Sequence, residues 1–282
     1  MNMPTKKSAV TKTKPFAEGI RVVPLHNQKS NVKLIDLGKE KEDSELFTGH
    51  PHAAPATAKL VYGGGPLLTN ATVYTIYWGK NWASAPAYVT LKGKINDFFK
   101  SILTSKLIDQ LSEYSVPGKT IGHGSFKGTK TITAAAPVPH SSVNDTSIRK
   151  ALKGWIAAGT VPKPTTNMLY FIYTDIHVKV IMGGSASCSS FCGYHDAINK
   201  SIFYAVMPFP SCSGCLGGQS VFNAITGTSS HELCEAITDP APWSGWNDPV
   251  NGEIGDICAW TFKKVNGYNV QKEWSNVHNQ CV

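Results

Sequence analysis

The sequence lacks two kinds of hydrophobic segment. No apolar run in its 282 residues approaches the roughly 18 needed to cross a bilayer, so we expect no membrane span. Residues 1–20 carry lysines but no apolar stretch, and so they contain no recognisable signal peptide. The hydrophobic fraction is nevertheless 41%, which is enough for a core and excludes a wholly disordered chain.

Several motifs are also missing. No G-x-S-x-G element for a serine nucleophile occurs. The glycine triplet at 63–65 lacks the Lys-Ser/Thr ending of a phosphate loop, which argues against nucleotide binding there. Much of the net charge of +8 comes from lysines near the N-terminus, and no aromatic-basic stripe follows. We therefore expect no specific nucleic-acid partner.

Cysteine is absent from the first two thirds of the chain, and all seven cysteines lie from Cys188 onward. Such clustering indicates either disulfides or a structural zinc. We favour disulfides, because the Cys212-Ser-Gly-Cys215 spacing has no second C-x-x-C partner. The odd count leaves one thiol, for which Cys234 is the candidate because it lies in a predicted helix. The disulfide candidates are Cys188, Cys192, Cys212, Cys215, Cys258 and Cys281.

Composition divides the chain into two parts. Residues 1–58 form a flexible basic leader, which is polar, Lys/Glu-rich and then Pro/Ala-rich, and which buries too little to fold. Within it, residues 20–23 could form a short docked strand. Order is expected from Lys59, so that residues 59–282 form one domain without an internal repeat.

Apolar patterns in this domain predict an α/β fold. Runs of β-branched and aromatic residues predict strands at 73–78, 168–173 and 202–207. Helical spacing of apolar residues predicts helices over 91–111, near 145–156 and from about 219 to 238. The segment after the last helix is predicted to be an irregular, cysteine-rich tail.

The last predicted helix carries the most suggestive chemistry. His231 and Glu235 are four residues apart, so they share one helix face and can hold the same divalent cation. Glu232 would stand where a water beside that cation could lose its proton, as a general base. This is the HExxH zinc pattern with Glu in place of the second His, and it predicts a Zn²⁺ site that needs further ligands.

Downstream acids and an upstream histidine can complete this site. We expect Glu253 or Asp256 to be the further metal ligand, and Asp239 is another candidate. His195, which follows Phe-Cys-Gly-Tyr, is a candidate ligand or proton donor if the fold brings it close.

Other interpretations of the same residues stay open. Ser229 and Glu232 could form a capping box if Gly227 breaks the helix. The acidic loop after Trp246 could hold a structural Ca²⁺ through oxygen ligands, although it does not match an EF-hand. A single histidine such as His195 is often purely structural.

Three stretches of the domain resemble the Exordium-like, phosphate-induced protein family of plants and its microbial relatives. They are Gly64-Gly65-Pro66-Leu67-Leu68 with the strand to Gly79, Phe191-Cys192-Gly193-Tyr194-His195, and His231-Glu232-Leu233 through Thr238-Asp239-Pro240 to Gly255-Asp256-Ile257-Cys258. The resemblance spans residues 59–282 and implies an extracellular or cell-wall-associated protein, but no established reaction. The missing signal sequence and the lysine-rich leader depart from the plant pattern.

The leading hypothesis is therefore an extracellular, single zincin-like domain with a mixed sheet. It would be a metal-dependent hydrolase acting on a peptide, with His231 and Glu235 as ligands and Glu232 as base. The alternative is a non-catalytic protein that binds a cell-wall polymer, another carbohydrate or a protein partner, with a structural His/Glu/Asp cluster. In that alternative Trp243, Trp246 and Trp260 could stack on sugar rings.

Overall fold

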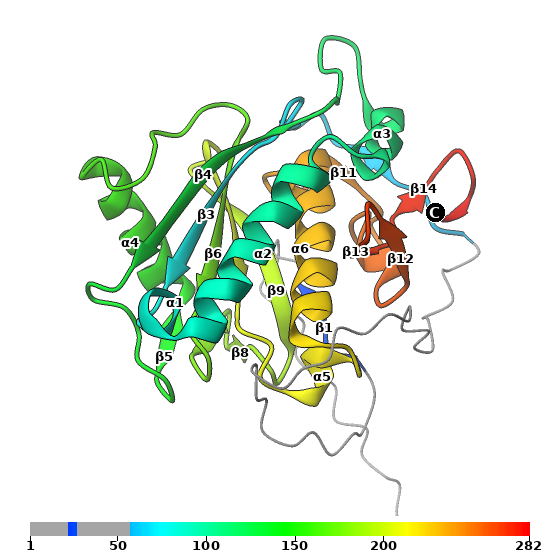
Figure 1. The fold of residues 1–282 in the computed structure, drawn as a ribbon. Helices are drawn as coiled ribbons and strands as arrows, with labels where there is room; N and C mark the ends of the chain where they lie inside the picture. Colours follow the sequence, from blue (N-terminus) through cyan, green and yellow to red (C-terminus); the bar gives the residue numbers. More distant parts are fainter. Residues whose placement is uncertain (1–21, 27–56) are drawn as a thin grey trace, which may run out of the picture.

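The structure is a computed structural model that describes residues 22–26 and 57–282 (Figure 1). Most of the predicted leader, residues 1–58, lies outside these ranges. The described part of it includes strand β1 (Val23–Pro24), in the region where a short docked strand was predicted.

A six-stranded mixed sheet forms the centre of the molecule (Figure 1). In spatial order its strands are β1, β9 (Phe191–Ile198), β10 (Ile202–Met207), β6 (Met168–Thr174), β3 (Thr72–Trp78) and β4 (Ser125–Ile132). The strands from β10 to β4 are parallel, whereas β9 pairs antiparallel with both β10 and β1. The predicted α/β class with a mixed sheet is therefore confirmed, and the three predicted strands are β3, β6 and β10.

Helices cover both faces of this sheet. Helices α2 (Pro86–Ile102) and α6 (Val221–Thr238) pack on one face, and α4 (Asp145–Ala157) packs on the other (Figure 1). Because side chains alternate along a strand, Tyr77 and Tyr173 face α2 and α6, while Ile76 and Ile172 face α4. Strands buried on both faces read as continuous apolar runs, which explains why β3, β6 and β10 could be predicted.

The single helix predicted over 91–111 is wrong, because the chain forms two helices there. Helix α2 ends at Ile102, and α3 (Lys106–Leu111) begins after Ser105, whose hydroxyl accepts a hydrogen bond from the amide of Leu107. Apolar residues keep helical spacing across the break, so the pattern alone did not show it.

Strands β4 and β9, which lie on opposite sides of the three predicted strands, were not predicted. Strand β4 is Lys-rich and exposed along much of its length, as is common for an edge strand. Strand β9 contains Gly193 and polar residues that give no two-residue alternation, although most of it is buried.

The segment after α6 is less irregular than predicted. It forms two small antiparallel pairs, of which the first packs against α6. The remaining elements are short: β2 (Val61–Tyr62), α1 (Asn81–Ser84), a 3-10 turn (Ser112–Tyr114), β5 (Ser142–Asn144), β7 (Lys179–Met182), β8 (Ser185–Ala186), α5 (Ser213–Leu216), β11 (Trp246–Asn247), a 3-10 turn (Asp256–Cys258), β12 (Phe262–Val265), β13 (Tyr268–Gln271), β14 (Trp274–Ser275) and β15 (Gln280–Cys281).

Disulfides are confirmed, and Cys234 is a buried free thiol. The bonds join Cys188 to Cys212, Cys192 to Cys215 and Cys258 to Cys281. Two of the three therefore lie before α6, tying the start of β9 to the segment that leads into this helix. The tail itself carries one disulfide, so the description "cysteine-rich" fits the segment before α6 better.

Candidate functional site

Helix α6 supplies the side chains of His231, Glu232 and Glu235, which are all fully buried. The helix begins after Ser220, whose side chain accepts a hydrogen bond from the amide of Asn223. Nε2 of His231 lies 2.9 Å from Oε1 of Glu235, one turn further along. The predicted sharing of one helix face is therefore observed.

The burial and continuity of α6 decide how its polar residues are placed. The helix is buried on all sides along its C-terminal part, so the face shared by His231 and Glu235 is enclosed by the protein. The helix also continues through Gly227 without a break, which rules out a capping box at Ser229. The Ser229 hydroxyl instead lies 2.8 Å from the hydroxyl of Tyr173 on the sheet.

Strand β9 adds His195 to the cluster. Its Nδ1 lies 3.1 Å from Oε2 of Glu232, and its Nε2 lies 3.0 Å from the carbonyl oxygen of Asp239. Both partners are acceptors, so the ring satisfies them together only when both of its nitrogens carry a proton. Burial alone lowers the pKa of His195, but the carboxyls of Glu253, Glu232 and Glu235 outweigh it and raise the pKa well above 6.5. His195 is therefore a charged donor that holds one oxygen of Glu232.

A loop at residues 252–256 closes over α6. A Cβ on Gly255 would lie 2.8 to 2.9 Å from three ring atoms of His231, so glycine permits this close approach. The amide of Asp256 donates to Oε1 of Glu235 at 3.2 Å, and Oδ2 of Asp256 accepts from the amide of Glu253 at 3.1 Å. The loop thus brings two further carboxyls to the histidines.

The carboxyls of Glu253 and Glu235 are in opposite electrostatic situations. Neither oxygen of Glu253 has a hydrogen-bond partner among the described residues. Burial raises the pKa of Glu253 well above 4.5; the charge of His195 opposes the rise and that of Glu235 adds to it. For Glu235 burial also acts to raise the pKa, but the imidazoles of His231 and His195 outweigh it and hold the pKa at about 2.

Asp239 is placed as a structural residue of the loop. Its carboxylate accepts hydrogen bonds from the amides of Trp243 at 2.7 Å, Ser244 at 3.1 Å and Gly245 at 2.6 Å. These bonds close the turn after α6, and the carbonyl of Asp239 anchors His195. The side chain that we considered as a further ligand is thus occupied by backbone amides.

Two groups of side chains, all buried except the half-buried Asp256, could hold a metal ion, and they share Glu235. One consists of His231, Glu235 and Asp256, and the other of His195, Glu235 and Glu253; within each group the ligand atoms lie within 4.8 Å of one another. Cys188, Cys212 and Cys215 also come this close, but their sulfurs are bonded in two disulfides and offer no thiolate.

Glu273, between β13 and β14, is a buried acid that the sequence did not indicate. Both of its oxygens lack a hydrogen-bond partner within residues 22–26 and 57–282. Burial raises its pKa well above 4.5, while His231 opposes the rise. No motif surrounds Glu273, so only its position beneath α6 reveals it.

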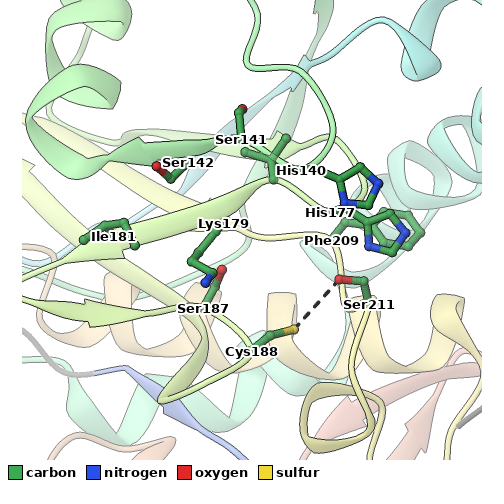
Figure 2. A pocket seen from close by; sticks show the side chains of 11 residues that line it. His140, Ser141, Ser142, His177, Lys179, Ile181, Ser187, Cys188, Phe209 and Ser211 are labelled. Carbon is green, nitrogen blue, oxygen red and sulfur yellow. Dashed lines mark hydrogen bonds between the residues drawn. The ribbon is translucent and has the colours of Figure 1, made fainter.

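A separate pocket of about 530 Å³ lies away from the cluster (Figure 2). His140 and His177 stack at its rim with ring centroids 4.8 Å apart, and Lys179 and Ser211 also line it. Its lining, as far as the described residues show, contains no member of the His/Glu/Asp cluster. The pocket therefore adds no group to the candidate metal site.

Compared with known proteins, the chain matches no protein-family model and no curated protein. Among the described residues, no helix is both long and apolar enough to cross a membrane. Function is therefore inferred from the geometry of the site.

Proposed function

We propose that this chain is a divalent-metal-dependent hydrolase with a zincin-like site, and that it cleaves amide bonds in peptides. The observation that carries the proposal is the excess of buried and half-buried carboxyls around the two histidines. Glu232, Glu235, Glu253 and Asp256 supply four carboxyls against two imidazoles. With Glu253 neutral, as its raised pKa favours, and His231 neutral as a metal ligand must be, three carboxylates and the charged His195 leave two negative charges (three minus one). Uncompensated charge is costly in a protein interior, and one divalent cation cancels it.

The ion is best assigned to His231, Glu235 and Asp256. In the competing group, both nitrogens of His195 already have acceptor partners, whereas His231 directs Nε2 at Glu235 and has no other polar partner in the described part of the chain. One neutral imidazole and two carboxylates balance a divalent charge. The 2.9 Å separation of Nε2 and Oε1 would need to widen by about 0.5 Å, because ligands of tetrahedral zinc at ~2.1 Å lie about 3.4 Å apart.

The donor set favours zinc over calcium. An imidazole nitrogen with carboxylate oxygens is a common zinc shell, while calcium takes six to eight oxygens. When bound, the ion would polarise a substrate carbonyl and make a neighbouring water more acidic.

Glu232 is the proposed base. Oε2 of Glu232 is held by His195, and Oε1 has no hydrogen-bond partner among residues 22–26 and 57–282. Oε1 is directed toward Gly193 on β9, because a Cβ built on Gly193 would lie 3.3 Å from it. There it can take a proton from the water that attacks the amide carbon. The C–N bond then breaks, and the proton passes to the leaving nitrogen.

We further propose that the chain is an Exordium-like protein that acts outside the cell. Two of the stretches that carry the resemblance, at His195 and at His231 to Cys258, supply the cluster. Three disulfides are typical of oxidising compartments, which supports an extracellular location.

The burial of nearly all of the cluster favours a second candidate, a non-catalytic binding protein with a structural metal or ion-pair cluster. Of the three tryptophans considered for sugar stacking, Trp260 is core, and Trp246 packs between Tyr62 and Tyr114. Trp243 is 36% exposed and is the one among them with a large accessible surface. A single exposed ring is weak support for polysaccharide binding.

Metal content tests the proposal directly. Purified protein, dialysed without chelator, is analysed by elemental mass spectrometry beside His231→Ala, Glu235→Ala and His195→Ala. His123→Ala is the matched control, because His123 is a half-exposed histidine paired with Asp109. We expect about one zinc per chain, lost with His231 or Glu235 and retained with His195 or His123.

The other outcomes separate the alternatives. Loss of zinc in His195→Ala but not in His231→Ala would move the ion to the competing group. Calcium in place of zinc would make the site structural. A metal-free wild type would refute the metal proposal, and the binding protein would then be the better candidate. Peptide hydrolysis that disappears in Glu232→Gln, with zinc retained, would support the assigned base.

A further inference from the structure

The outer edge of β9 is occupied by the described part of the leader. Val23 pairs antiparallel with Gly193, and Pro24 pairs with Phe191 across a register shift. The carbonyl of Pro24 accepts a hydrogen bond from Nε1 of Trp260 at 2.9 Å. Beyond the strand, the amide of His26 donates to the carbonyl of Gly214 at 2.7 Å. The main chain of residues 22–26 is thus held by an edge strand and its surroundings.

The side chains of this segment alternate between two apolar surfaces. Val22 joins the core cluster that contains Phe191 and Tyr194, and Val23 joins a different cluster. That second cluster is formed by Cys192, Cys215, Ala259, Trp260 and Phe262. Main-chain pairing combined with pockets for alternate side chains is how sheet edges recognise extended peptides.

This edge leads to the proposed catalytic cluster. Gly193, opposite Val23, lies against α6, where an added Cβ would be 2.9 Å from Thr228 and 3.3 Å from Oε1 of Glu232. Two residues further along β9 is His195, which holds the other oxygen of Glu232. A peptide paired with β9 in this register, and continuing past the position of Val22, would run alongside His195.

We propose that the outer edge of β9 is a binding site for an extended peptide with two consecutive β-branched apolar residues, and that Val22–His26 occupies it as an internal competitor. That the peptide is a substrate rests on the proposed function; the strand site itself does not. Removal of the internal strand opens the edge to a peptide in trans.

The test uses the full-length chain and a fluorescent probe peptide, Ala-Ala-Val-Val-Pro-Leu-His. The probe repeats residues 22–26 after two alanines that reach the level of His195. Fluorescence anisotropy compares the wild type with Val23→Asp, in which a charge replaces a buried side chain, and with Val277→Asp, where the valine is 70% exposed. We expect Val23→Asp to bind the probe at least tenfold more tightly than the wild type, because the internal strand no longer competes. Val277→Asp should bind like the wild type.

A second variant designed to release the internal segment, Val22→Asp, alters the side chain that packs on the other apolar surface. Circular dichroism and thermal unfolding identify which variants are folded. No gain in probe binding by either folded variant would overturn the inference, whatever the metal content. A probe with Asp in place of its second Val should bind none of the proteins, and equal binding of that probe would also overturn the inference. Tight binding without cleavage by zinc-loaded protein would support the strand site and count against the hydrolase.

Discussion

Gly255→Ala tests whether His231 is a metal ligand without changing any ligand atom. The backbone of Gly255 has φ −80° and ψ −38°, which alanine adopts freely, so the substitution acts only through its added methyl group. That methyl group would lie 2.8 to 2.9 Å from three atoms of the His231 ring, whereas ordinary contacts begin near 3.4 Å. The ring must therefore move by about half an ångström, beyond the ~0.2 Å tolerance of metal–ligand distances.

The expected result is a tenfold to hundredfold loss of zinc affinity, equivalent to about 1.4 to 2.7 kcal/mol. Overpacking should also destabilise the metal-free protein by about 1 to 3 kcal/mol. Competition against a coloured zinc chelator measures affinity, and thermal unfolding in excess chelator measures the stability of the metal-free form.

Gly93→Ala is the matched control, because a Cβ at this position in α2 meets no heavy atom of the described chain within 4 Å. It should leave zinc affinity unchanged and stabilise the helix by about 0.5 to 1 kcal/mol. Wild-type zinc affinity in a folded Gly255→Ala protein would refute the assignment of His231 as a ligand.

Three further substitutions or modifications test other parts of the structure. The Asp239→Asn protein should keep its zinc, but its Tm should fall by several degrees. The reason is that loss of the hydrogen bond from the Trp243 amide costs about 1.5 to 3 kcal/mol of stability. Loss of zinc in this variant would instead make Asp239 a ligand. Arg149→Met should destabilise the protein by about 1 to 3 kcal/mol in denaturant titrations at pH 7, since Nη1 lies 2.6 Å from Oδ2 of the partly buried Asp196. Burial raises the pKa of Asp196, so protonation removes its unpaired charge and this deficit should shrink as the pH falls; a constant deficit would contradict the ion-pair explanation. Cys234 should resist alkylation by iodoacetamide in the native protein, because its thiol is buried. After unfolding without reductant it should be the one cysteine that is alkylated, which the mass of the intact protein measures. Rapid labelling of the native protein would contradict the burial of Cys234.

The fold could be predicted in its buried parts and not at its edges. Strands β3, β6 and β10 are apolar on both faces, so their sequences carry a strong signal. Strand β9 owes its conformation to pairing with β10 and β1 and to the two disulfides at its N-terminal end, and such long-range contacts leave no local periodicity. The break between α2 and α3 was hidden because apolar spacing continues through Ser105.

Within the site, local sequence was enough to predict the relation between His231 and Glu235, because a helix places residues four apart on one face whatever surrounds it. It also marked Glu232, Glu253 and Asp256 as acids close to these two in the chain. Local spacing could not show that the C-terminal part of α6 is buried all round, which makes these charges costly unless they are compensated.

The remaining roles depend on tertiary packing. His195 reaches Glu232 only because β9 packs against α6, and Asp239 is diverted to loop amides only because the turn after α6 closes on it. The assignment of Asp256 to one histidine and Glu253 to the other follows from the path of a loop held against His231 at Gly255. These contacts join residues distant in sequence, whose distances depend on the packing of whole elements and not on local backbone geometry.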